Sequence, residues 1–221
     1  MGSSFGLDNT NHSARHTGEA FGLGRRGGPK APNPKGPDLR LPLRQDSPPR
    51  HTQEVPLMGR ADTDHWWEPD GPADLRDQVL ADFMTDITYG PDGETVKHGW
   101  LDDVYTGQVV EFRRVNWPHP DAVEVDHIVS LEDAWNSGAW EWGGDNPKWG
   151  RFFTELRGLV PTLAKVNREK GGKNAAEWLP PNRAYWQRYV ITQIQIKTKY
   201  ELSATESELA VMRAILEAER P

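Results

Sequence analysis

The pattern of hydrophobic and polar positions predicts an ordered C-terminal part that contains both helices and strands. After Pro72, apolar residues recur at a spacing of four, which predicts an amphipathic helix over residues 73–87. Pro91-Asp-Gly93 then breaks the chain. Clusters of β-branched residues predict strands over residues 108–112 and 122–129, and the second segment alternates apolar and polar positions.

The same reading extends to the next segment of the chain. Residues 131–135 and 148–156 have a helical pattern, whereas residues 159–166 are predicted to be extended. Pro161 lies in the extended segment and favours an edge strand, because proline has no N–H to donate to a neighbouring strand. A helix is predicted to begin near Asn167.

The C-terminal end carries one ambiguous segment and one clear helix. Residues 184–199 fit the period of a helix and that of a strand. Ser203 and Glu206 have the spacing of a capping box, and apolar residues follow at helical spacing. We therefore predict a C-terminal helix that starts after Ser203.

The N-terminal part has a different composition. Residues 1–60 hold 9 glycines, 8 prolines and no apolar periodicity, so they bury too little surface to offset the entropy of ordering. We predict a disordered basic tail over residues 1–60 and one globular domain over residues 61–221, which holds all ten tryptophans. An electrostatic arm, a partner-binding segment and a simple linker all stay open as roles for the tail.

Residue usage excludes several classes of chemistry. The chain has no cysteine, which rules out disulfides, thiolate zinc sites and cysteine nucleophiles. No apolar run reaches the roughly 18 residues of a membrane span, so we predict no membrane association. The N-terminus lacks a charged segment followed by an apolar one, and we therefore expect a cytoplasmic protein.

Charge is partitioned along the chain. The formal net charge is -7, but residues 61–147 carry -16 and residues 148–199 carry +8. A basic stretch of this kind can bind a polyanion while the remainder stays acidic. A solvated helical face is the alternative interpretation.

Two segments carry the residues that point to chemistry. Val123-Glu-Val-Asp-His-Ile-Val129 and the later run from Gly158 to Lys173 have the order strand, insertion, strand, helix. An Asp-His pair at a strand end and an Asn at a helix start can supply two oxygen ligands and a general base. Phosphodiester hydrolysis needs such parts, and hard oxygen ligands favour magnesium or manganese. Taken alone, the Asp-His pair would more often be structural.

Further motifs, in order along about residues 64–218, resemble a known family. The motifs are Leu101-Asp-Asp-Val-Tyr-Thr-Gly107, Val125-Asp-His-Ile-Val-Ser-Leu-Glu-Asp-Ala-Trp-Asn-Ser-Gly-Ala139, Asn167-Arg-Glu-Lys-Gly171, Glu177-Trp-Leu-Pro-Pro-Asn182 and Ile196-Lys-Thr-Lys-Tyr-Glu-Leu202. They resemble the HNH, or ββα-metal, endonucleases, specifically the C-terminal domain of GmrSD-type modification-dependent restriction enzymes and stand-alone actinobacterial proteins.

The resemblance implies an α+β fold with a ββα-metal (HNH, His-Me finger) core and surrounding helices. It implies a metal-dependent endonuclease that hydrolyses DNA, with His127 as the general base. Asp126 and Asn167 would hold one Mg²⁺ or Mn²⁺ per active site. Because neighbours in a regular strand point to opposite faces, Asp126 and His127 can serve one phosphate only if the strand ends or bulges there. Asn167 as a helix N-cap is an alternative role.

Basic residues are expected around this centre. Lys170 would stabilise charge on the phosphate as a catalytic residue. The predicted substrate-binding residues are Arg168, Lys173, Arg113 and Arg114. The alternatives are solvated helix positions for the lysines and for Arg168, and an exposed sheet edge for the Arg113-Arg114 pair.

One departure from the family pattern leaves a second function open. Family members carry an Asn nine residues before the position of Asn167, where this chain has Gly158. The family Asn braces the base, so its loss favours the alternative of a weak or inactive nucleic-acid-binding module of the same fold. RNA as a substrate, a homodimer, and a partner bound by the tail also stay open.

Overall fold

The protein combines helices and strands, as the sequence pattern predicts. The computed structural model describes residues 41–44, 75–114, 123–142 and 147–218. Its strands and helices are β1 (Leu43–Arg44), α2 (Leu75–Phe83), β2 (Met84–Tyr89), β3 (Val96–Asp103), β4 (Gln108–Arg113), β5 (Val123–His127), α3 (Leu131–Asn136), α4 (Pro147–Phe153), β6 (Leu159–Leu163), α5 (Ala164–Lys170), α6 (Trp186–Tyr200), β7 (Ala204–Thr205) and α7 (Glu206–Ala218). This mixture places the fold in the α+β class.

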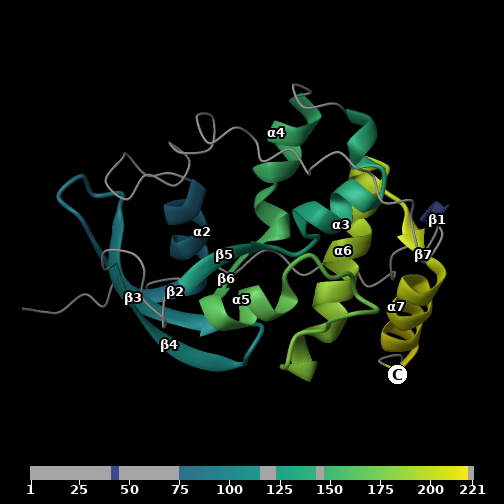
Figure 1. Cartoon of the computed structure of the whole chain (residues 1–221). Helices are drawn as coiled ribbons and strands as arrows, with labels where there is room; N and C mark the ends of the chain where they lie inside the picture. The colour runs from purple at the N-terminus through teal and green to yellow at the C-terminus, as the bar shows by residue number, and fades with distance from the viewer. Residues whose placement is uncertain (1–40, 45–74, 115–122, 143–146, 219–221) are drawn as a thin grey trace, which may run out of the picture.

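The β2–β3–β4 sheet forms one end of the molecule, and β1, β7 and α7 form the opposite end (Figure 1). Its three strands are antiparallel. The predicted helix over residues 73–87 is wrong over residues 84–87, because α2 ends at Phe83 and β2 begins at Met84. Thr85, Ile87 and Thr88 are β-branched and favour the strand. The strand β3 was not predicted.

The centre of the molecule is the pair of strands β5 and β6, with α5 directly after β6 (Figure 1). In the chain, α3 and α4 lie between the two strands. The two strands pair in regular antiparallel register, from Val123 opposite Leu163 to His127 opposite Leu159. The predicted strand over residues 122–129 is confirmed by β5. The extended segment predicted over residues 159–166 is confirmed only as far as Leu163, and Pro161 within it lies in an edge strand as expected. The helix begins at Ala164 rather than near Asn167.

The C-terminal helices resolve one ambiguity and correct one prediction. Residues 184–199 are mainly helical, since α6 spans Trp186–Tyr200. The capping box of α7 lies two residues after the predicted pair. The amide of Glu208 donates to Thr205 Oγ1 at 3.1 Å, and the amide of Thr205 donates to Glu208 Oε2 at 3.3 Å. This reciprocal pair satisfies backbone donors that the start of the helix leaves free.

Four residues of the segment predicted to be disordered belong to the folded part. The strand β1 pairs in parallel with β7, and Leu41 is buried in the main hydrophobic core. The predicted tail therefore does not include residues 41–44, and the rest of residues 1–60 lies outside the described residues. None of the helices in the described part of the chain is both long and apolar enough to cross a membrane.

Candidate functional site

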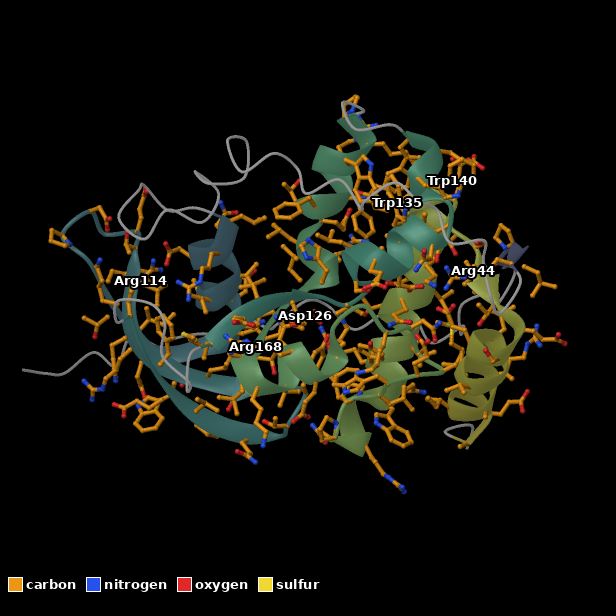
Figure 2. The ribbon with its side chains drawn as sticks, viewed as in Figure 1. Arg44, Arg114, Asp126, Trp135, Trp140 and Arg168 are labelled. Carbon is orange, nitrogen blue, oxygen red and sulfur yellow. The ribbon has the colours of Figure 1, made fainter. Side chains whose placement is uncertain are left out.

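Asp126 lies at the centre of a buried polar cluster between β5 and α5 (Figure 2). Its Oδ2 accepts a hydrogen bond from the Tyr105 hydroxyl at 2.6 Å, and its Oδ1 lies 2.9 Å from Lys170 Nζ. Burial raises the pKa of Asp126, while the Lys170 ammonium and the Tyr105 hydroxyl act in the opposite direction. Each carboxylate oxygen of Asp126 thus has a partner from the protein.

Tyr105 is held in place by the turn that follows β3. Its amide donates to Asp103 Oδ1 at 2.9 Å, and the same oxygen accepts from the Thr162 hydroxyl at 2.9 Å. Asn182 Nδ2 donates to the Val104 carbonyl at 3.0 Å, which joins two of the sequence motifs. Tyr105 lies in the motif Leu101–Gly107, from which no role was predicted for it. The only sequence feature that could have pointed to Tyr105 is its place in the Asp103-Val-Tyr105 part of this motif.

His127 ends β5 with its ring on the face opposite Asp126. Its Nε2 lies 2.9 Å from the Phe153 carbonyl oxygen, which can only accept, so Nε2 carries the hydrogen. The ring stacks on Phe152 with a centroid distance of 6.1 Å and an interplanar angle of 10°. Burial lowers the pKa of His127 to about 4. The imidazole is therefore uncharged at neutral pH, and the lone pair of Nδ1 is not used by this hydrogen bond.

A second carboxylate shares the α5-facing side of β5. Asn167 Nδ2 donates to Glu124 Oε2 at 3.0 Å, and Arg168 Nη2 donates to Glu124 Oε1 at 2.9 Å. Asn167 therefore contacts Glu124 rather than Asp126. It also lies within α5, whose N-cap is Leu163, so the alternative role of Asn167 as an N-cap is wrong. Glu124 is a site residue that sequence reasoning missed.

The remaining predicted basic residues lie in different surroundings. Lys170 is fully buried, so it is not the solvated helix residue of the alternative interpretation. Lys173 is exposed, and its ammonium donates to the Glu169 carbonyl. Arg168 is 59% exposed on α5, next to the strand that carries Asp126 (Figure 2).

The two arginines after β4 differ from each other. Arg113 is 66% exposed and pairs with Glu111. Arg114 lies on the three-stranded sheet, where its guanidinium is mostly buried and pairs with Asp77 (Figure 2). Its Nε also donates to the Val96 carbonyl at 2.7 Å. This placement gives Arg114 a structural role that joins α2 to β3, and does not present it to a substrate.

The position of the missing family Asn is a packed backbone site. The Gly158 carbonyl accepts a hydrogen bond from the Ile128 amide at 2.7 Å, just beyond the β5–β6 pairing. A Cβ at residue 158 would lie 3.5 Å from the Ile196 side chain, which is ordinary contact. The backbone thus tolerates a side chain here, but an Asn side chain would extend toward Ile196.

The predicted metal ligands do not fit a divalent cation in their described arrangement. Both oxygens of Asp126 have partners, and one partner is itself a cation. Asn167 is bonded to Glu124 instead of lying beside Asp126. A divalent ion at Asp126 would be repelled by the Lys170 ammonium at short range. The cation beside the Asp126 carboxylate is therefore the Lys170 ammonium, whereas the resemblance implied a divalent metal ion.

Comparison with known proteins finds a relative from a fungus. The chain is 28% identical over 154 residues to an uncharacterized secreted protein of the fungus Arthroderma benhamiae, an alignment that covers 69% of this chain and 71% of the relative. No family model matches the chain. No solved structure matches it either. Because that relative is described as secreted, our prediction of a cytoplasmic protein is contradicted.

Proposed function

We propose that this chain is a nuclease that hydrolyses phosphodiester bonds of DNA, with His127 as the general base. The observation that carries the proposal is the uncharged, oriented imidazole at the end of β5. The order β5, β6, α5 and the ordered sequence motifs support the same interpretation. The secreted relative supports an extracellular setting for the activity.

In the proposed reaction, Nδ1 of His127 takes a proton from water as the water oxygen attacks phosphorus. The bond from phosphorus to the 3′ oxygen breaks, and this oxygen takes a proton from solvent. The products are a 5′-phosphate and a 3′-hydroxyl. The hydrogen bond from Nε2 to the Phe153 carbonyl fixes the tautomer that this step requires. Arg168 on α5 and Lys173 just after this helix are exposed and would contact backbone phosphates.

The proposal assigns no step to a divalent cation, because the Asp126 carboxylate is already paired with Lys170. The same observation favours a second candidate, a nucleic-acid-binding module that keeps the fold without cutting. Gly158 at the position of the family Asn points in that direction. The two candidates differ in whether bound DNA is cleaved.

The test is plasmid nicking by wild type and His127→Gln, with magnesium, with manganese and with EDTA. Loss of a general base typically lowers the rate about 10²–10⁴-fold, and we expect a loss of this size. His98→Gln is the matched control, because His98 lies on β3 and pairs with Glu111. We expect that variant to cut at the wild-type rate.

Each outcome decides between the candidates. Cutting by wild type and His98→Gln, but not by His127→Gln, supports the nuclease and its base. Equal cutting by all three proteins would remove His127 from the mechanism. If none cuts but all bind DNA in a salt-sensitive manner, the binding module becomes the better account.

A further inference from the structure

Lys170 is one of the most deeply buried charges in the described part of the chain. Its side chain is 0% exposed, and its ammonium lies 2.9 Å from Asp126 Oδ1 and 2.8 Å from the His127 carbonyl oxygen. Burying an ammonium is costly unless it is paired and hydrogen-bonded. Both requirements are met here, because the Lys170 ammonium on α5 is paired with Asp126 and hydrogen-bonded to the His127 carbonyl.

The two carboxylates on this face of β5 are both matched by cations of α5. Glu124 pairs with Arg168 at 2.9 Å, and Asp126 pairs with Lys170 at the same distance. Residues 124 and 126 lie on one face because side chains alternate along a strand. The charge of Asp126 is thus already balanced before any ion from solvent arrives.

Access to Asp126 is limited from its other side as well. Its second oxygen accepts the Tyr105 hydroxyl at 2.6 Å, and its side chain is only 7% exposed. An ion that enters this position must displace at least one of these two partners. Displacing Lys170 would bring two cations close together or force the ammonium toward solvent.

We propose that the Lys170 ammonium occupies the cation position beside Asp126 and competes with divalent cations for this carboxylate. The inference rests on the proposed function only in its consequence for cleavage. The wild-type protein then binds Mn²⁺ weakly at Asp126. Removing the ammonium while keeping the carboxylate creates a site that binds Mn²⁺ more tightly.

The experiment titrates the full chain with Mn²⁺ alone and measures the binding by calorimetry. We expect Lys170→Met to bind Mn²⁺ at least about tenfold more tightly than wild type, because a nearby positive charge no longer opposes the ion. The double variant Lys170→Met/Asp126→Asn should lose this gain. Lys173→Met is the matched control, since it removes the same charge from an exposed position, and should bind as wild type does.

Equal Mn²⁺ affinity of wild type and Lys170→Met would overturn the inference. A second measurement covers the case in which Lys170→Met does not fold. In wild type labelled with ¹⁵N-lysine, the ammonium signal of Lys170 is followed while Mg²⁺ is added. Competition requires this signal to move as Mg²⁺ binds at Asp126. Mg²⁺ binding that depends on Asp126 but leaves the signal unchanged would refute competition.

Neither measurement uses nucleic acid, so its result is independent of cleavage. A wild type that cuts plasmid through His127, but whose Mn²⁺ affinity does not respond to Lys170→Met, would contradict this inference alone. Equal plasmid cutting by wild type and His127→Gln, together with tighter Mn²⁺ binding by Lys170→Met, would contradict the proposed function alone.

Discussion

The carboxylate of Asp126 and the imidazole of His127 belong to consecutive residues of β5, yet they lie on opposite faces of the strand. Asp126 faces α5 and pairs with Lys170, whereas His127 bonds to the Phe153 carbonyl on the other side. The strand pairing stays regular through His127, without the bulge that would bring the two groups together. The His127 imidazole and the Asp126 carboxylate therefore have separate sets of partners, although the two residues are neighbours in the chain.

The first prediction concerns the titration of His127. Burial lowers its pKa to about 4 from the ordinary value of 6.5, so the folded protein resists protonation of this ring. The stability that the neutral ring contributes is complete above pH 6.5. It is lost as the pH falls from 6.5 toward 4, because the unfolded chain takes up the proton first. Below that range the loss levels off.

This titration can be measured in two ways. Urea unfolding at a series of pH values should show wild type losing stability relative to His127→Gln between pH 6.5 and 4. NMR titration of the ring should give a midpoint near the lower end of that window. A ring that titrates at its ordinary value would show that His127 is not held in the described surroundings.

The second prediction concerns the hydroxyl of Tyr105. Tyr105→Phe keeps the aromatic packing but leaves Asp126 Oδ2 without the donor that lies at 2.6 Å. Hydrogen bonds to charged groups contribute about 1.5–3 kcal/mol, and we expect the free energy of unfolding to fall by this amount. Chemical denaturation at neutral pH measures the change.

Tyr185→Phe is the control for this experiment. Tyr185 belongs to the same aromatic cluster, with its ring centroid 5.9 Å from that of Tyr105. Within the described part of the chain, the side-chain donors to Asp126 are Tyr105 and Lys170, and not Tyr185. A small change is therefore expected there. Equal losses in the two variants would mean that the bond to Asp126 contributes nothing specific.

The error in the predicted helix over residues 73–87 has a simple physical cause. Residues four apart share a face in an α-helix, but they also share a face in a strand, whose period is two. The apolar positions Val79, Phe83 and Ile87 therefore could not show where α2 ends and β2 begins. The strand β5 was predicted because its apolar and polar positions alternate along the strand.

The partners in the site depend on where α5 starts. Asn167 and Lys170 are three residues apart, so both point from the helix toward β5. Because α5 begins at Ala164 instead of near Asn167, Asn167 meets Glu124 and Lys170 meets Asp126. The sequence identified the carboxylate but could not determine this register. No local pattern distinguishes a lysine that pairs with a carboxylate from one that lies in solvent.

The third prediction concerns Arg44, which anchors residues 41–44 to the domain (Figure 2). Its guanidinium lies 2.8 Å from Asp133, and Lys197 lies 2.9 Å from Asp133 and 2.5 Å from Glu208. Burial by itself would raise the pKa of Asp133, but Lys197 and Arg44 lower it. Arg44→Met leaves two buried carboxylates with one cation, and we expect a loss of about 3 kcal/mol in unfolding free energy.

Two further variants separate the charge network from simple packing of the segment. Leu43→Ala changes the exposed neighbour in β1, which is 69% exposed, and should alter stability by no more than about 0.5 kcal/mol. Adding Asp133→Asn to Arg44→Met removes one of the two buried carboxylates and leaves Glu208 matched by Lys197, so the double variant should lose less stability than the sum of the single losses. Additive losses would mean that Arg44 stabilises the fold by packing its aliphatic stem, and that the N-terminal segment is held by Leu41 and the β1–β7 pairing instead.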